Sequence, residues 1–401
     1  MRRLIALLLL ISLVCTMVSC EGVPSPTVPP IGESTADTTV EQKPSTPEPL
    51  VISEKSKTDY VVVYSDILGT ASEDALNYLQ NQFKKTTGAS ISCIRDTGES
   101  YEYEILFGST SRTESQSVEP PLEDEILIKV IGKKILLLAG CEALMNNAID
   151  RFIDNLGGKN GVITLPDTFE LRVKADFARI RIATFNIHNG LDVDYNFKTI
   201  ARDILQSGAS VVALQEIDQM TSRNQYQDTM QLLSEYTGFP YYSYFATVPN
   251  MQGGQYGIAV LSKYPINSFE GEWLPRNGNA EQRAALKTVI NIGGASLSFI
   301  STHCDGGIIE KELATIRQML SAGELYAIGG DFNSQDYQQF EVFEYAGLAN
   351  SKSNPLVTTR NGKYIDNLVC SGDILINSAK AINTGHSDHF LVVADVTIYL
   401  K

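Results

Sequence analysis

The chain has 401 residues, a formal net charge of −15 and a sequence pI near 4.8. Neutralising several nucleic-acid phosphates normally takes a basic face, so this balance disfavours a duplex binder or a processive nuclease. The length after the N-terminal segments exceeds one typical hydrophobic core, which predicts two globular domains.

The N-terminus has the organisation of an export signal. Two arginines precede an apolar run from Leu4 to Val14, which is shorter than the roughly 20 residues that a membrane-spanning helix needs. Ser19 before Cys20 resembles a bacterial lipoprotein cleavage site, so we expect residues 1–19 to be removed and Cys20 to be lipidated. Two or more acyl chains on that cysteine suffice for stable anchoring. A plain secretory signal cut nearby is the alternative.

Residues 20–58 are rich in Pro, Ser, Thr and Glu and show no apolar period. Such a segment buries too little apolar surface to offset the entropy of ordering it. We therefore expect a disordered, semi-extended tether. The chain is predicted to be exported and lipid-anchored to the outer face of a bacterial membrane, in an extracellular or periplasmic location.

Residues 59–173 have the pattern of a small α/β domain. Strands are expected at 60–64 and 104–107, with a hairpin of 126–131 and 135–138 about Gly132-Lys133. Helical spacing of apolar residues predicts one helix that starts at Ser72 and a second from Leu144 to Leu156.

The run from Glu104 to Arg112 resembles the non-catalytic α/β domain that precedes the barrel in β-hexosaminidases. This resemblance implies an accessory module without catalytic residues, for which contact with a cell wall or carbohydrate is a speculative role. Arg112 is expected to form a structural ion pair, because most charged side chains do not contact ligands.

Residues 176–401 predict a second domain with many strands and fewer helices. Strands are expected at 179–187, 211–214, 241–248, 258–262, 284–290, 297–302, 325–328, 365–369 and 390–398, and helices at 197–205 and 309–320. Several strands follow one another as hairpins, which favours two packed sheets over a single doubly wound sheet.

Five short polar segments end apolar runs in this half of the chain, and together they hold all four histidines. They are 184–188, 214–216, 301–305, 329–333 and 386–389. The central one, Gly329-Gly330-Asp331-Phe332-Asn333, follows a buried strand and places Asp331 and Asn333 at its carboxyl edge, where open α/β sheets bind ligands. Each segment alone also fits an ordinary turn, but their shared placement favours a site.

Acidic residues of the second domain would repel one another if they converged. Two carboxylates about 4 Å apart cost roughly 4 kcal/mol at an effective dielectric near 20, so protons or a cation must offset the charge. Carboxylate and amide oxygens suit Mg²⁺, with Mn²⁺ as the possible substitute. A zinc site is disfavoured, because the sequence has no closely spaced His/Cys pattern.

With these segments in view, the region from Arg179 to Val396 resembles the endonuclease/exonuclease/phosphatase family of metal-dependent phosphohydrolases, which includes deoxyribonuclease I, abasic-site endonucleases, sphingomyelinases and inositol polyphosphate phosphatases. The resemblance implies an α/β fold in which a two-sheet, four-layer sandwich forms the catalytic domain. It also implies a metal-dependent enzyme that hydrolyses phosphoesters.

The resemblance implies a role for each matched residue. Glu216 would be the principal metal ligand, assisted by Asn186 and Asp388. Asp366 would hold His389 in the required tautomer, as a carboxylate behind an imidazole usually does.

The remaining matched residues would act on the substrate. His303 and Asn333 would donate hydrogen bonds to the phosphoryl oxygens as charge spreads over them. Asp331 would orient or deprotonate the attacking water, or protonate the leaving oxygen. The division of acid and base roles between Asp331 and His389 stays open at this stage.

Four further residues are not assigned a definite role in the site. Three of them have two possible interpretations, and the fourth has a structural one. His188 and Asp305 fit either the site or structural hydrogen bonding, and Arg283 fits either phosphate binding or an ion pair. His386 fits a turn. Cys304, beside His303, should point to the opposite face of its strand and be a buried thiol.

We predict a Mg²⁺-dependent phosphodiesterase or phosphatase acting on small or lipid-linked phosphoesters. An extracellular nuclease would use the same site, but it would need a basic or aromatic groove that the sequence does not display. A non-catalytic surface-binding lipoprotein would need a vestigial site. Of the mature cysteines, Cys93 and Cys141 share a domain and are a candidate disulfide pair, since export permits disulfides without requiring them.

Overall fold

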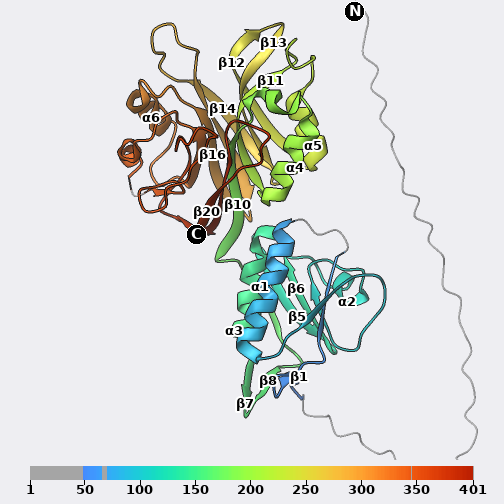
Figure 1. Ribbon diagram of the computed structural model, residues 1–401. Helices are drawn as coiled ribbons and strands as arrows, with labels where there is room; N and C mark the ends of the chain where they lie inside the picture. The colour runs from blue at the N-terminus through green and yellow to red at the C-terminus, as the bar shows by residue number, and fades with distance from the viewer. Residues whose placement is uncertain (1–47, 66–69, 345, 401) are drawn as a thin grey trace, which may run out of the picture. The chain divides into compact units, whose positions relative to one another are not determined.

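The computed structural model describes residues 48–65, 70–344 and 346–400 (Figure 1). The predicted signal at 1–19, the lipidation site Cys20 and the tether up to residue 47 therefore lie outside the described residues. The predictions for these segments are not tested by the structure.

The N-terminal part of the described chain contains one six-stranded mixed sheet, in the order β3-β2-β4-β6-β5-β9, and a three-stranded sheet, β1-β8-β7. Its elements are β1 (Leu50–Glu54), β2 (Val61–Tyr64), α1 (Thr70–Thr87), β3 (Ser92–Arg95), β4 (Glu104–Phe107), α2 (Thr113–Gln116), β5 (Glu125–Ile131), β6 (Lys134–Ala139), a 3-10 turn (Glu142–Leu144), α3 (Met145–Asp154), β7 (Gly157–Lys159), β8 (Val162–Leu165) and β9 (Glu170–Lys174). Helices α1 and α3 pack on one face of the larger sheet through residues such as Leu79, Phe83 and Phe152 (Figure 1).

This region differs from the sequence-based expectation in several details. Strands β3, β7, β8 and β9 and the short helix α2 were not predicted. Helix α1 begins at Thr70, so Ser72 lies inside the first turn and does not precede it. Strand β1 lies within 20–58, where we expected only tether, and it pairs with β8. The pairing is favoured because Ile52, in the short apolar run of β1, is fully buried. The hairpin about Gly132-Lys133 is confirmed, with β5 antiparallel to β6.

Arg112 is confirmed as a structural ion-pair residue. Its Nη1 lies 2.7 Å from Asp96 Oδ1 and its Nη2 lies 3.1 Å from Glu104 Oε1, while Lys134 Nζ lies 2.5 Å from Glu104 Oε2. Glu104 is fully buried. Burial alone raises the pKa of Glu104, but hydrogen bonds from Arg112 and Lys134 outweigh it and lower the pKa. The carboxylate therefore stabilises the fold above its ordinary pKa and loses this effect as the pH falls.

The C-terminal part contains two six-stranded sheets, ordered β12-β13-β11-β10-β21-β20 and β14-β15-β16-β17-β19-β18. Its elements are β10 (Phe177–Asn186), a 3-10 segment (His188–Val193), α4 (Phe197–Ser207), β11 (Val211–Gln219), α5 (Thr229–Thr237), β12 (Tyr241–Met251), β13 (Gly254–Ser262), β14 (Ile266–Trp273), β15 (Ala284–Ile292), β16 (Ala295–His303), α6 (Ile309–Gln318), β17 (Tyr326–Asp331), a second 3-10 segment (Tyr337–Val342), β18 (Gly347–Leu348), β19 (Asp366–Cys370), β20 (Ile374–Ile382) and β21 (Leu391–Tyr399).

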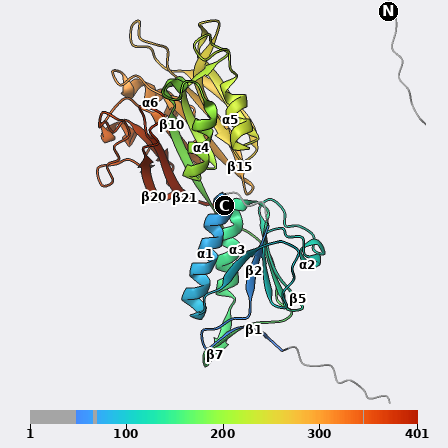
Figure 2. The same ribbon diagram turned by 45° about the vertical axis from the view of Figure 1, so that its right-hand side comes forward.

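The two sheets pack face to face, and helices cover their outer faces, which confirms the predicted four-layer sandwich. Residues such as Ala213 and Phe299 form the core between the sheets. Helices α4 and α5 cover the first sheet and α6 covers the second (Figures 1 and 2). At Gly329 the sheets approach so closely that a Cβ atom would lie 2.9 Å from Ala213 Cβ and 3.1 Å from Thr184 Cβ. Glycine is therefore required there.

The sequence-based prediction missed strands β14, β18 and β20 and helix α5. Strands β14 and β20 end the order of their sheets, and most of their side chains are exposed or half-buried, so they lack the apolar pattern of a central strand. Strand β11 also continues to Gln219, beyond the expected end at Leu214.

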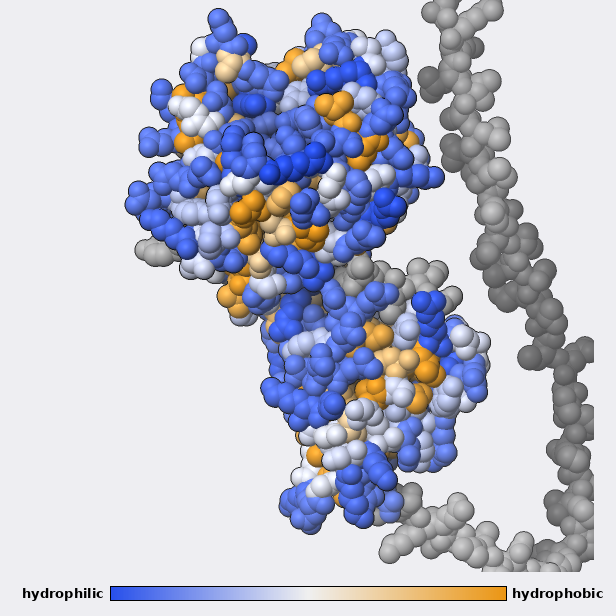
Figure 3. Space-filling view, in the orientation of Figure 1, coloured by the Kyte–Doolittle hydropathy of each residue, from blue (hydrophilic) through white to orange (hydrophobic). Residues whose placement is uncertain are grey.

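One face of the surface is mainly hydrophilic (Figure 3). In the view of Figure 3, hydrophobic residues form separate small groups within a mainly hydrophilic face. Within the described ranges, every helix is too short or too polar to cross a bilayer. The four cysteines of these ranges are free, so the Cys93–Cys141 pair considered above is not formed. Cys304 is buried as expected.

The Arg112 cluster generates a stability prediction. Glu104→Gln should lower the free energy of unfolding by about 3 kcal/mol, because it leaves buried cations without their carboxylate. Glu102→Gln is the matched control, since Glu102 pairs with Lys133 at the surface and its loss should cost about 0–1 kcal/mol. Denaturant unfolding followed by circular dichroism measures both changes. Equal effects of the two variants would contradict the structural role of Glu104.

Candidate active site

One cross-strand row brings three of the predicted residues together. His303 at the end of β16 pairs in register with Asp331 at the end of β17, and Asp331 pairs with Asp366 at the start of β19. Side chains of directly paired residues lie on the same face of a sheet. The three segments are distant in sequence, and strand register alone makes them neighbours.

The other sheet contributes Asn186 and Glu216. Asn186 ends β10, and Glu216 lies in β11 at an irregularity between Leu214 and Ile217, where the backbone of Glu216 takes a φ of 59°. A bulge of this kind re-aims a side chain, and a non-glycine residue in the left-handed region marks local strain. Asn186 Nδ2 donates to Glu216 Oε1 at 3.0 Å and to Asp331 Oδ2 at 3.1 Å. The amide thus links the two sheets.

Asp331 is the centre of these contacts. Its carboxyl is 2% exposed and accepts from Asn333 N at 2.9 Å. The Oδ2 atom lies 3.4 Å from His303 Nε2 and 3.6 Å from His389 Nε2. Burial, followed by the negative charge of Asp366, raises the pKa of Asp331 to about 7. Asp331 is therefore poised to exchange a proton near neutral pH.

His389 is held by Asp366. Its Nδ1 lies 2.9 Å from Asp366 Oδ2, and its backbone N–H donates to Ser387 Oγ at 3.1 Å. Asp366 is 1% exposed, so its carboxylate is enclosed by protein beside the imidazole. Burial on its own lowers the pKa of His389, but the charge and hydrogen bond of Asp366 outweigh it and raise the pKa to about 10. The imidazole is therefore cationic at neutral pH and directs Nε2 at Asp331.

His303 has the opposite protonation state. Burial, and then the positive charges of Arg283 and His389, hold its pKa well below the usual range. Arg283 Nη1 lies 3.1 Å from Nδ1 of His303 and 2.6 Å from Glu281 Oε1. Because the guanidinium donates to Nδ1, the neutral ring carries its proton on Nε2. Arg283 thus forms the ion pair that one of its two predictions gave, and it also contacts His303.

Asn333 lies against the same imidazole. Its Nδ2 donates to the Cys304 carbonyl at 3.1 Å and lies 3.2 Å from His303 Nε2, while its backbone takes a φ of 50°. Asn tolerates this left-handed conformation better than most residues. The sharp turn after Asp331 therefore directs the Asn333 amide back into the site.

Asp388 and His188 lie together beside this cluster. His188 Nδ1 lies 2.7 Å from Asp192 Oδ2 and 3.6 Å from Asp388 Oδ1, and the ligand atoms of the three residues lie within 4.8 Å of one another. Arg360 Nη1 lies 2.8 Å from Asp192 Oδ1 and offsets part of the negative charge. Neither Asp192 nor Arg360 stood out in the sequence, because nothing in their local pattern distinguishes them from turn residues.

Two of the singled-out residues have structural roles. Asp305 Oδ1 accepts from Gly307 N at 2.9 Å, and its own backbone N–H donates to both oxygens of Glu312 at 2.9 and 3.0 Å. His386 Nδ1 lies 2.8 Å from Asp203 Oδ2 of helix α4. These contacts shape loops and are separate from the contacts of Asp331.

The donor set around Glu216 fits a hard divalent cation. In the part of the chain that the structure describes, its oxygens accept only from the neutral amides of Asn186, at 3.0 Å, and Asn189, at 3.5 Å. A half-buried carboxylate without a cationic partner, beside an amide and further acids, offers the oxygen ligands that Mg²⁺ prefers. Asn189 was missed by the sequence reading although it follows His188 directly.

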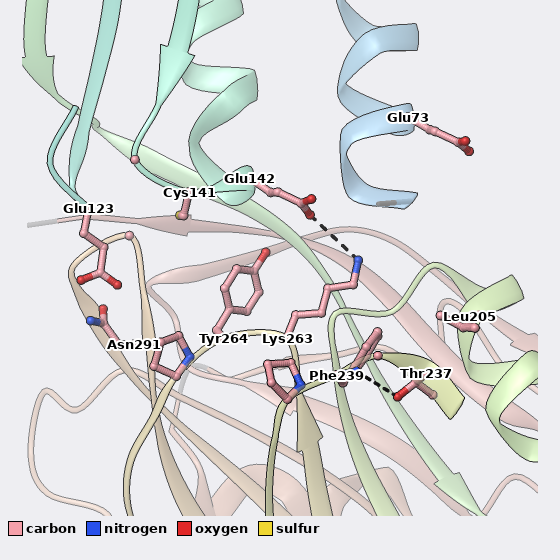
Figure 4. Close-up of a pocket in the computed structure, with 15 residues that line it drawn as sticks. Glu73, Glu123, Cys141, Glu142, Leu205, Thr237, Phe239, Lys263, Tyr264 and Asn291 are labelled. Carbon is pink, nitrogen blue, oxygen red and sulfur yellow. Dashed lines mark hydrogen bonds and ion pairs between the residues drawn. The ribbon is translucent and has the colours of Figure 1, made fainter. Parts of the chain in front are cut away.

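A separate pocket of about 800 Å³ lies away from this cluster. Among its lining residues are Glu73, Glu142, Lys263 and Tyr264, and Lys263 Nζ lies 3.9 Å from Glu142 Oε2 (Figure 4). None of the described residues that line it belongs to the Asp331 cluster. The pocket carries no part of the chemistry described above.

Comparison with known proteins identifies one family. The profile of the Endonuclease/Exonuclease/phosphatase family matches residues 183–389, just over half of the 401-residue chain. No curated protein sequence is significantly similar to the chain.

Three solved structures of similar fold are compared with this chain by TM-score, sequence identity and the share of each chain that is covered. An endonuclease/exonuclease/phosphatase from Beutenbergia cavernae has a TM-score of 0.49 and 17% identity over 55% of this chain and 72% of its own. A family protein from Leptotrichia buccalis has a TM-score of 0.45 and 19% identity over 54% of this chain and 98% of its own. The human Nocturnin catalytic domain with bound sulfate has a TM-score of 0.45 and 18% identity over 55% of this chain and 94% of its own.

The Asp366–His389 pair generates a pH prediction. Asp366→Asn removes the charge that keeps His389 protonated, so the pKa of His389 should fall from about 10 to near or below its ordinary 6.5. Histidine ring signals followed by NMR during a pH titration in chelator measure this shift. Asp203→Asn, which removes the partner of His386, is the matched control and should leave the His389 titration in place. An unshifted His389 in Asp366→Asn would refute the assigned pairing.

Proposed function

The chain belongs to the endonuclease/exonuclease/phosphatase family, whose members are hydrolases acting on phosphoesters, and from this premise we propose that it is a Mg²⁺-dependent phosphodiesterase or phosphatase. The observation that carries the proposal is the buried Asp331 carboxyl, which contacts Asn186 and lies within ion-pair distance of both His303 and His389. A carboxyl with a pKa near 7 between a neutral and a cationic imidazole is suited to acid–base chemistry at phosphorus.

Glu216 and Asn186 would hold the divalent cation, with Asp388 as a further ligand. When bound, Mg²⁺ neutralises charge on the phosphoryl oxygens and orients the ester, and Mn²⁺ would serve in the same way. The strained backbone of Glu216 supports this assignment, since strain is retained where a side chain has a required direction.

His303 and Asn333 would bind the phosphoryl group. Neutral His303 carries its proton on Nε2, and the Asn333 amide lies 3.2 Å from that atom. These two donors converge on one position, which suits the negative charge that spreads over the phosphoryl oxygens in the transition state. Arg283 acts through His303 by fixing its tautomer, and it adds positive charge to the same wall.

Asp331 and His389 would divide the proton transfers. His389 is cationic beside Asp366, so it is suited to stabilise anionic oxygen and to donate a proton. Asp331, with a pKa near 7, is suited to accept the proton of the attacking water. Opposed environments that separate the pKa values of two neighbouring groups are the usual means of assigning acid and base.

The substrate is proposed to be a small or lipid-linked phosphoester. The acidic balance of the chain supports this choice over a nucleic acid, because the charge of −15 opposes approach of a long polyanion. The signal-like residues 1–19 and Cys20 support a lipid-anchored enzyme at the outer face of a bacterial membrane.

Site substitutions test the activity. Glu216→Gln, Asp331→Asn and His389→Ala should each lower kcat by about 10²–10⁴-fold while the protein stays folded, and EDTA should abolish turnover that Mg²⁺ restores. Release of product from bis-p-nitrophenyl phosphate and p-nitrophenyl phosphate separates diesterase from monoesterase activity.

His386→Ala is the matched control for this series, because His386 pairs with Asp203 away from Asp331. It should keep activity within a few-fold of the unsubstituted enzyme. Turnover that survives Asp331→Asn in a folded protein, or that ignores the chelator, would refute the proposed mechanism.

Anchoring is tested independently of activity. The full chain expressed with its N-terminus should partition into the detergent phase of a Triton X-114 extraction, and Cys20→Ser should move it to the aqueous phase, because one thioether-linked lipid group is lost. Ser19→Ala keeps a small residue before the cysteine and is the control. Equal partitioning of the Cys20→Ser and unsubstituted chains would refute lipidation.

A further inference from the structure

The cross-strand row that carries the site continues beyond His303 to the edge of the sheet. His303 pairs with Ala284 of β15, and Ala284 pairs with Trp273 at the end of β14. The order along the row is therefore Trp273, Ala284, His303, Asp331 and Asp366. Paired residues share a face, and two strand spacings amount to roughly 10 Å. The indole thus lies on the face of the sheet that carries the catalytic imidazole, within reach of a group attached to phosphorus.

Trp273 is supported on one side and open on the other. Its ring centroid lies 5.4 Å from that of Phe245 at an interplanar angle of 56°. Phe245 packs with Ile258 and Ala284, and its ring occupies the space above Gly271, where a Cβ atom would lie 2.0 Å from Phe245 Cδ2. Trp273 nevertheless remains 55% exposed. An exposed aromatic ring that is held in place by packing offers a flat apolar face to a ligand.

We propose that Trp273 is a stacking platform for a sugar ring in the substrate, so that the physiological substrate is a phosphorylated carbohydrate. The proposal rests on the proposed phosphoester hydrolase function and names the substrate class of that site. With its phosphoryl group beside His303 and Asn333, the sugar would extend along the row over Ala284 and lay its apolar ring face on the indole.

The loop that follows Trp273 carries polar groups that suit a neutral, hydroxyl-rich ring. Residues 275–283 connect Trp273 to Ala284, and this loop carries Asn277 and Glu281. Glu281 forms an ion pair with Arg283. The side-chain amide of Asn277 lies close to Gly307, as does Asp305 Oδ1. Carboxylates and amides accept and donate hydrogen bonds to sugar hydroxyls.

The same groups disfavour the other ligands that stack on an aromatic ring. Glu281, in the loop between Trp273 and Ala284, adds negative charge beside the row, which opposes a polynucleotide. An acyl chain would form no hydrogen bonds with the polar groups of this loop, whereas sugar hydroxyls would. A free nucleotide is the nearest competitor, because its base also has a planar face, and it is an arm of the test.

Trp273 is the single tryptophan of the chain, so its fluorescence reports directly on the platform. The full-length protein in EDTA, which blocks turnover, would be titrated with glucose 6-phosphate, AMP and glycerol 3-phosphate. Glucose 6-phosphate should change the Trp273 emission saturably, and glycerol 3-phosphate, which lacks a ring, should change it little. A stronger response to AMP than to glucose 6-phosphate, or no response to any of the three, would overturn the inference.

Kinetics with Mg²⁺ give the second measurement. Trp273→Ala should lower the ratio of kcat/KM for glucose 6-phosphate to that for glycerol 3-phosphate by about tenfold, mostly through KM, and Trp273→Tyr should restore much of it. Phe269→Ala is the matched control, because Phe269 is 57% exposed on the same face of the same strand, four residues from Trp273. That variant should keep the ratio of the unsubstituted enzyme.

The outcomes separate this inference from the proposed function. If both phosphoesters are hydrolysed but Trp273→Ala leaves the ratio unchanged, the platform is refuted and the hydrolase function stands. If neither is hydrolysed while the fluorescence responds to glucose 6-phosphate, the platform stands and the proposed reaction fails on these substrates. If Trp273→Ala and Phe269→Ala lower the ratio equally, a general effect of the β14 edge replaces the proposal.

Discussion

The site depends on one buried carboxyl, that of Asp331, held at the junction of two sheets. Because the carboxyl is buried, an uncompensated negative charge on it would cost free energy. Its neighbours offset this cost with hydrogen bonds and positive charge. Asn186 donates to it from the opposite sheet, Asn333 N donates to it from the following turn, and two imidazoles face it. The close approach of the sheets that this requires explains why Gly329 precedes it, since a Cβ there would collide with the facing sheet.

Two histidines beside the same carboxyl have opposite charge states. Burial lowers the pKa of both, but Asp366 outweighs it at His389 and raises that pKa, whereas the positive charge of Arg283 adds to it at His303. Two side chains of the same type, His303 and His389, thereby differ in charge. This separation of charge, and not the presence of histidine as such, is what suits the arrangement to phosphoryl transfer, where one side donates and the other accepts.

We propose that the residues that hydrolyse the phosphoester and the residues that select the substrate lie on different parts of the same sheet. The central strands β16, β17 and β19 carry the buried side chains of His303, Asp331 and Asp366, which are proposed to act at the phosphoryl group. The edge strand β14 and residues 275–283 carry the exposed Trp273 and polar groups, which tolerate change more readily. Such a division allows one catalytic apparatus to serve many esters, as the range of hydrolases in this family requires.

The layered fold, most of the central strands and the types of polar group that end them can be predicted from the sequence alone. Central strands are mainly apolar runs, and the acids, amides and imidazoles at their ends stand out against them. The tertiary structure was needed to show the contacts of Arg283 with His303 and of Asp192 with His188, and the redirection of Glu216 by an irregular strand. The edge strands β14 and β20 were also not predictable from the sequence, because exposed strands carry no apolar period. Strand register and sheet packing bring residues that are far apart in the chain into contact. The local sequence pattern contains no information about register or packing.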